Sequence, residues 1–107
     1  MLSPIERMMD LVTLDLSQNN IEDISPLAEL TYLSSLDLSQ NNITELAPLA
    51  EMKNLVTLDL SQNNISDLSV LTELTQLKQL YLQGNNFTND QRIAVEAALP
   101  NLESITW

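Results

Sequence analysis

Hydrophobic positions recur along this chain at a constant interval. The series starts at Leu11, Leu33, Leu55 and Leu77, and further leucines follow each of these by three and five positions. An asparagine also recurs, at Asn19, Asn41, Asn63 and Asn85. The period is thus 22 residues. Self-similarity at a fixed period of this length is typical of a solenoid, in which each unit buries its apolar side chains against its neighbours.

The period divides the 107 residues into the units of a single repeat domain. Three units have the same length, and they are 11–32, 33–54 and 55–76. A longer variant unit, 77–101, contains a helix, and a terminal strand at 102–107 resumes the leucine spacing. Residues 1–10 contain SPIERMMD, which aligns with SPLAELTY in the next unit. We therefore expect residues 1–10 to be a partial repeat that forms a thin N-terminal cap.

Within a unit, the pattern changes from an alternation to a turn and then to a short helix. Apolar and polar residues alternate in 12–17 (VTLDLS), which predicts a half-buried strand with Leu14 and Leu16 inside. The asparagine that follows predicts a bend in which its side chain satisfies buried backbone groups. The pair Ser25-Pro26 then predicts a short helical turn, with proline at the first position and serine as a cap.

The variant unit has the pattern of a longer helix. Thr88 and Gln91 match a capping box ahead of IAVEAAL, so we expect a helix at 89–98 that ends before Pro100. The same pattern in SPIE predicts a short helix at 4–9. The side chains expected to seal the last leucine layer against the C-terminal helix are Ile93, Ala94, Ala97 and Ala98.

The repeated pattern LxxLxLxxNxI, with SPLAEL and APLAEM behind it, resembles the leucine-rich repeat, in the 22-residue bacterial class found in internalins. The resemblance covers nearly all of the chain. It implies an α/β solenoid, which is a right-handed leucine-rich repeat arc. It also implies a concave parallel β-sheet, short convex helical or 3-10 turns and a C-terminal capping helix, with a protein partner on the concave side.

Charge and composition narrow the range of partners. Fifteen acidic and four basic residues give a net charge of −11, which repels phosphate backbones and anionic lipids, so we expect neither nucleic acid nor a membrane as a partner. Residues 1–10 lack the pattern of a signal peptide, and no run of 18 apolar residues occurs. We therefore expect a soluble chain, cytoplasmic by default.

The side chains present do not favour catalysis. The chain has no histidine and no cysteine, and its single glycine, Gly84, cannot make a phosphate-binding loop. We expect no enzyme, no catalytic residues and no cofactor. Asp15, Asp37 and Asp59 stand at equivalent positions, and a cation site there is an outside alternative. A flat wall has no loop to complete the six to eight oxygen ligands of Ca²⁺, so simple repetition is the favoured interpretation.

The outward positions of the predicted strands form a candidate protein-binding face. Its residues are Thr13, Asp15, Ser17, Ser35, Asp37, Ser39, Thr57, Asp59, Ser61, Gln79, Tyr81 and Gln83. These side chains predict a polar or basic protein partner. Tyr81 replaces aspartate in the fourth strand, and tyrosine is favoured at interfaces, although adaptation to the C-terminal helix is the simpler interpretation.

Two interpretations of the function remain open. The first is an interaction module that uses this face. The second is an idealised, designed or truncated array with no evolved ligand, because units 11–32 and 55–76 are identical at 17 of 22 positions. Weak self-association through the N-terminal end is also expected, because no full cap of the internalin kind covers its apolar side chains, which are Met1, Leu2, Ile5, Met8 and Met9.

Overall fold

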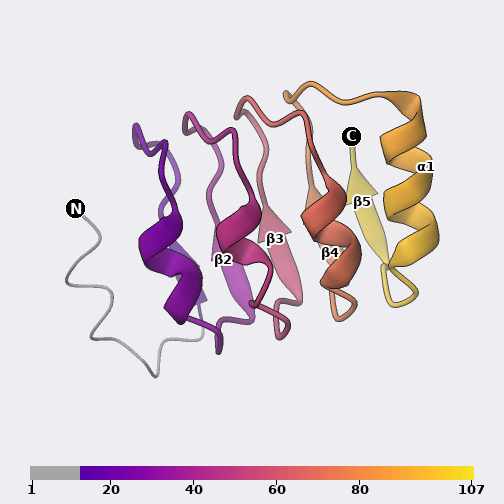
Figure 1. The fold of residues 1–107 in the computed structure, drawn as a ribbon, viewed down its shortest axis with the longest axis horizontal. Helices are drawn as coiled ribbons and strands as arrows, with labels where there is room; N and C mark the ends of the chain where they lie inside the picture. The colour runs from indigo at the N-terminus through magenta and orange to yellow at the C-terminus, as the bar shows by residue number, and fades with distance from the viewer. Residues whose placement is uncertain (1–12) are drawn as a thin grey trace.

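The strands and helical segments alternate along the chain and form two layers (Figure 1). A computed structural model describes residues 13–107. The strands are β1 (Thr13–Asp15), β2 (Ser35–Asp37), β3 (Thr57–Asp59), β4 (Gln79–Tyr81) and β5 (Ser104–Thr106), and all pair in parallel in the order β1-β2-β3-β4-β5. The helical segments are the 3-10 helices η2 (Ser25–Glu29), η3 (Ala47–Leu49) and η4 (Ser69–Glu73), and the α-helix α1 (Asn89–Ala98).

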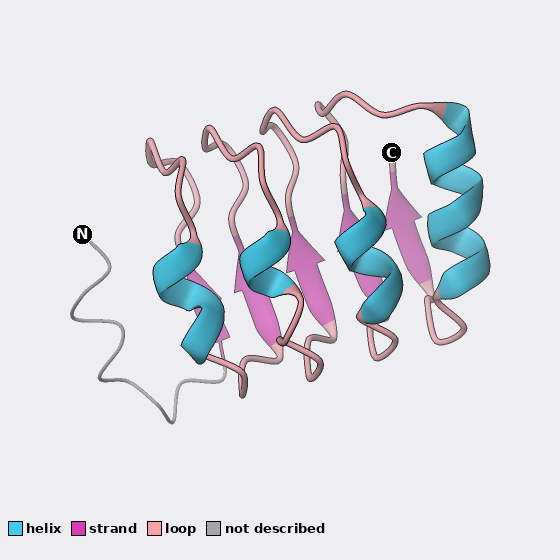
Figure 2. Cartoon of the chain, in the orientation of Figure 1, coloured by secondary structure: helices cyan, strands magenta, loops and turns pink. Residues whose placement is uncertain are grey.

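The helical segments form a row on one side of the sheet (Figure 2). This arrangement confirms the predicted α/β solenoid arc of parallel strands and short 3-10 turns, with α1 beside the last strand. The predicted partial repeat at 1–10 and the helix at 4–9 lie outside the described residues. The unit boundaries remain our proposal.

The core follows the leucine spacing. Leu14, Leu36, Leu58, Leu80 and Ile105 pair in register across the five strands, and the three central leucines are fully buried. A second set of buried side chains fills the space under the helical segments: Leu27, Leu49, Leu71, Leu30, Met52 and Leu74. Because each short strand adds a leucine layer to its neighbour, the units share one continuous core.

Each of the first four strands, β1 to β4, is followed by a residue in the left-handed backbone conformation. Gln18 and Gln40 have φ of 58°, Gln62 has φ of 57°, and Gly84, at the equivalent position of the variant unit, has φ of 80°. This conformation costs an L-residue about 1 to 2 kcal/mol. The bend is held by the next unit, because the backbone N–H of Gln40 donates to the Ser61 carbonyl at 2.9 Å. The alternating pattern did not predict this role for glutamine.

Gly84→Ala is expected to destabilise the fold by about 1 kcal/mol, because alanine is strained at positive φ. A Cβ at Gly84 would also lie 2.7 Å from the end of the Gln62 side chain, which must move away. Urea unfolding followed by circular dichroism measures the loss. In a Gln62→Ala background the loss should be smaller, and an equal loss in both backgrounds would show that the close contact contributes nothing.

The serine residues at the start of the 3-10 helices do not cap them, contrary to the prediction. Ser25 is the first residue of η2, and the preceding Ile24 makes no side-chain capping bond. The Asp23 carboxylate instead accepts a hydrogen bond from the Ser25 N–H at 2.9 Å, and Asp67 does the same for Ser69 at 3.0 Å. These bonds lower the pKa of both carboxyl groups.

Helix α1 has the predicted bounds and the predicted Thr88 cap, which accepts from the Gln91 N–H at 3.3 Å. Its orientation differs from the prediction. Val95 and Leu99 are buried, whereas Ile93 is 58% exposed. Ala94 and Ala97 are also exposed, and Ala98 is partly buried. Ile93, Ala94 and Ala97 therefore do not seal the last leucine layer.

Contacts at both sides of α1 explain its orientation. The Gln91 side chain bonds to the backbone of the preceding unit, at Ser66 and Leu68. The Arg92 guanidinium lies over the Trp107 ring, 4.9 Å from its centroid, and the Trp107 indole N–H donates to Glu96 at 3.0 Å. Together these contacts turn Val95 toward the core.

Candidate interaction surface

The parallel register aligns the outward side chains of the sheet in two rows. The first row is Thr13, Ser35, Thr57, Gln79 and Ser104. The second row is Asp15, Asp37, Asp59, Tyr81 and Thr106. We call these two rows the sheet face. Ser104 and Thr106 are exposed and were not predicted, although Ile105 continues the spacing of Leu80 and could have indicated them.

Two predicted face residues are not accessible. Ser39 and Ser61 are only 8% and 5% exposed, and Ser17 is half-buried. Beyond the short strands the chain bends toward the turn, so the alternation of outward positions stops at the aspartate. The accessible face of the central strands therefore has two outward positions in each strand, not three.

A repeated hydrogen-bond pair explains why the two central serines are buried. Asp37 Oδ1 accepts from the backbone N–H of Ser39 at 3.0 Å and from its hydroxyl at 2.7 Å. Asp59 and Ser61 are paired in the same way, at 3.0 and 2.6 Å. One carboxylate oxygen of each aspartate thus stabilises the bend after its strand, and the other is not used in this pair.

Asp15 and Ser17 form the same pair at the first strand, with distances of 2.9 Å to the backbone N–H and 2.7 Å to the hydroxyl. The hydroxyl bond, and after it the backbone bond, lowers the pKa of the Asp15 carboxyl group. Because the folded pKa is below the unfolded value, the stability from this pair is present above the unfolded pKa. It is lost as the pH falls through the folded pKa.

Ser17→Ala is expected to raise the pKa of Asp15 toward its ordinary value without reaching it, because the backbone bond remains. The carboxyl carbon chemical shift of Asp15, followed by NMR from pH 7 to pH 2, measures this change. The variant should also lose less stability than the wild type between neutral pH and about pH 3, below the ordinary aspartate pKa of about 3.9. An unchanged titration of Asp15 would contradict this assignment.

The aspartate row does not form a metal centre in the part of the chain that the structure describes. Within residues 13–107, no group of three or more acidic, histidine or cysteine side chains is placed to hold a metal ion. Each of Asp15, Asp37 and Asp59 instead directs one oxygen to its own serine. The outside alternative of a cation site therefore gains no support.

The chemistry of the sheet face changes at β4. The Thr57 hydroxyl donates to Gln79 Oε1 at 2.9 Å, so these side chains are joined across the strands. Tyr81 follows Asp59 in the second row and is half-buried. Next to this strand, Gln83 Oε1 is buried and has no hydrogen-bond partner among the described residues. At β4, the sheet face therefore changes from an aspartate to a tyrosine in the second row.

The fold and the sheet face together define a class of protein: a leucine-layered repeat solenoid with an open polar sheet. The chain belongs to the leucine-rich repeat family, because the family model described as "Leucine rich repeat" matches residues 31–87. A second model, of two leucine-rich repeats, matches residues 10–51. Leucine-rich repeat proteins are typically non-enzymatic scaffolds.

Solved structures place the chain in the internalin-like class. An internalin (inlF) from Listeria monocytogenes is 33% identical with a TM-score of 0.89, over 95% of this chain and 30% of that one. Internalin C2 from the same organism is 34% identical with a TM-score of 0.87, over 100% of this chain and 49% of that one. A leucine-rich repeat protein from Leptospira interrogans is 26% identical with a TM-score of 0.82, over 94% and 26% of the two chains.

The chain therefore spans between about a quarter and about half of the length of these three proteins. No curated protein matches it in sequence. Within residues 13–107, no helix has the length and the apolar character needed to cross a membrane.

Proposed function

We propose that this chain is a non-catalytic interaction module that binds another protein through its sheet face. The leucine-rich repeat fold commonly mediates protein–protein interaction. The observation that carries the proposal is the alignment of polar side chains, at two outward positions in each of five strands, above a continuous buried core. Such a surface is rigid, so binding does not require the strands to be ordered.

The partner is a basic protein segment. The net charge of −11 attracts cations over a distance, and Asp15, Asp37 and Asp59 concentrate negative charge on the sheet face. Parallel strands are about 4.8 Å apart. Basic residues three or four positions apart on an α-helix rise by about 4.5 to 6 Å, whereas alternate residues of an extended chain are about 6.6 Å apart. A basic helix lying across the strands therefore matches the aspartate row best.

Specificity is supplied at β4. The aspartates already use one oxygen within the fold, so they provide charge more than selective contacts. Tyr81 offers apolar area and a hydroxyl at low entropic cost. We expect an apolar or cationic side chain of the partner on the Tyr81 ring.

Selection of displayed basic helical peptides against the chain, at low salt and at 500 mM salt, tests the proposal. Binding should weaken as salt rises. It should also weaken in an Asp37→Asn/Asp59→Asn variant, because asparagine can still accept from the serine but has no charge. The double variant Glu29→Gln/Glu51→Gln, at two exposed positions on the side of the helical segments, removes the same two charges and serves as the matched control. Salt-independent binding, or equal losses in the two variants, would contradict the proposal.

An idealised or truncated array without an evolved ligand is the alternative. The identity of two units at 17 of 22 positions favours it. The Asp37–Ser39 and Asp59–Ser61 bonds give these residues a structural reason to be constant, so their uniformity does not argue against a partner. Self-association through residues 1–10 remains a prediction, and light scattering at high protein concentration measures it.

A further inference from the structure

A crevice lies between η4 and α1, on the side of the molecule opposite the sheet face. Its volume is about 170 Å³, and its lining includes Leu68, Ser69 and Thr72 from the η4 side and Ala94 and Val95 from α1. In Figure 1, α1 stands next to η4 at the end of the row of helical segments. The crevice is therefore separate from the sheet face.

Gln91 holds the two walls of the crevice together at one end. Its amide nitrogen donates to the Ser66 carbonyl at 2.6 Å, and its Oε1 accepts from the Leu68 N–H at 2.9 Å. The walls beyond this contact have short side chains, such as Ala94 and Ser69, which cannot fill the space between them. The crevice thus results from small residues on two elements whose separation is fixed.

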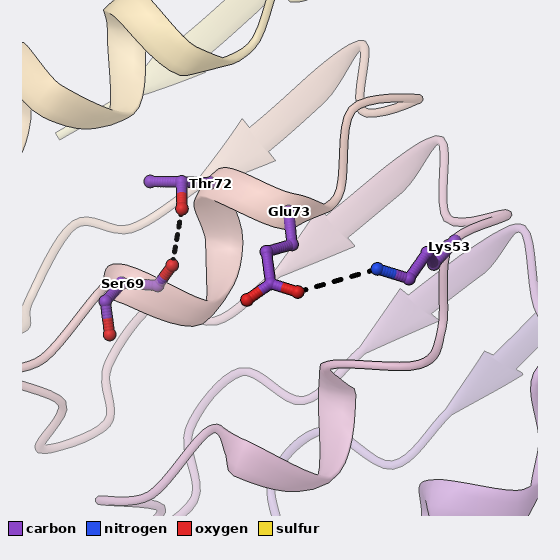
Figure 3. Close-up of polar contacts among 4 residues, drawn as sticks. All are labelled: Lys53, Ser69, Thr72 and Glu73. Atoms are coloured by element: carbon purple, nitrogen blue, oxygen red, sulfur yellow. Dashed lines mark hydrogen bonds and ion pairs between the residues drawn. The ribbon is translucent and has the colours of Figure 1, made fainter.

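The interior of the crevice is apolar. Leu68 and Val95 are buried at its base. The Thr72 hydroxyl points back to the Ser69 carbonyl and donates to it at 2.6 Å, so this polar group is satisfied within η4 (Figure 3). A dry cavity of about 150 Å³ holds a benzene ring. The crevice can therefore take one large apolar side chain.

A smaller hollow of about 90 Å³ lies on the other side of η4, against η3, and its lining includes Leu46, Ala47 and Val70. Asp67 lines both hollows. Its carboxylate accepts from the Ser69 N–H at 3.0 Å, which lowers its pKa, so it carries its charge at neutral pH. No lysine or arginine is among the residues that line either hollow.

We infer that the two hollows form a second docking site, for a short segment of a partner protein in which two apolar side chains flank a lysine or arginine. The apolar side chains occupy the hollows, and the cation lies over Asp67 between them. A second copy of this chain is a poor occupant, because each copy has a net charge of −11. Since this site and the sheet face are on opposite sides, both can be occupied at once.

A phage library of random 12-residue peptides, selected against the whole chain, tests the inference. Enriched peptides should contain the apolar–basic–apolar pattern, and their synthetic forms are the probes for fluorescence anisotropy. Ala94→Phe, which fills the crevice from an exposed position, should weaken their binding at least tenfold. Asp67→Asn should weaken it several-fold and reduce its salt dependence.

Two matched variants locate the binding. Ala97→Phe makes the same change at an exposed position of α1 that does not line the crevice, and Asp37→Asn changes the sheet face; neither should affect these peptides. Ala47→Phe, in the smaller hollow, replaces Ala94→Phe if that variant melts below the wild type. Unchanged binding to Ala94→Phe, loss of binding in Asp37→Asn, or no enrichment of the pattern would overturn the inference. None of these outcomes depends on whether the sheet face binds a helix.

Discussion

Leu55→Ala is expected to lower the free energy of unfolding by about 3 to 5 kcal/mol, which is the range for a leucine deleted from a packed core. Leu55 is fully buried and lies in the middle of the array, between the layers of Leu33 and Leu77. The lost side chain leaves a cavity that neighbouring units cannot close, because their strands are held in register on both sides. Urea unfolding followed by circular dichroism measures the loss.

The matched control is Leu102→Ala, at the equivalent position before the last strand. Leu102 is only half-buried, and it has one neighbouring unit within the described structure. We expect a loss of about 1 to 2 kcal/mol, in proportion to the smaller area removed from water. Similar losses for the two variants would mean that the last layer is as tightly packed as the middle of the array.

Asn63→Ala is expected to cost about 3 kcal/mol, because it removes four hydrogen bonds at once and takes from the Ile43 N–H the Oδ1 that accepts from it. The Asn63 amide nitrogen donates to the carbonyl groups of Leu60 at 3.0 Å and Ser61 at 3.2 Å in its own unit. It also donates to Leu38 of the preceding unit at 2.9 Å, and its Oδ1 accepts from the Ile43 N–H at 3.1 Å. The side chain thus joins two units in the middle of the array, where fraying of an end cannot relieve the loss.

Asn19→Ala is the control for this prediction. Asn19 is exposed, and among the described residues its amide nitrogen donates only within its own unit, to Leu16 at 2.9 Å and Ser17 at 3.1 Å. Its replacement should cost about 1 kcal/mol or less, because water can reach the carbonyl groups that it leaves. Thermal and urea unfolding of both variants measure the two losses of stability. Equal losses would contradict the role of Asn63 in joining two units.

The sequence alone predicted the layers of the solenoid, because the spacing of leucines and asparagines is itself what determines them. Leu36 and Leu58 can be buried side by side only if their strands pair in parallel with a shift of one whole repeat, and the structure has this register. The asparagine bends and the bounds of α1 followed from equally local chemistry. These features depend on residues close in the chain or on strict repetition.

The candidate site was predicted only in part. The sequence identified the two rows of the sheet face in the first four strands but not in β5. It also placed the buried Ser39 and Ser61 there, and it assigned the constancy of the Asp and Ser residues to simple repetition. Their hydrogen bonds show a structural role that an alternation of polar and apolar residues cannot express.

Tertiary contacts decided the features in which this chain departs from a simple repeat. The orientation of α1 depends on Gln91 bonding to Ser66 and on Arg92 lying over Trp107, and the members of each pair are distant from one another in the chain. The Gln91 bonds also fix the separation of α1 and η4, and the short side chains between them leave the crevice beside Ala94. The repeat spacing determined which side chains enter the core, because burial is a periodic property. Contacts between neighbouring units decided which of the remaining side chains are accessible at the surface, because such contacts depend on the positions of two elements at once.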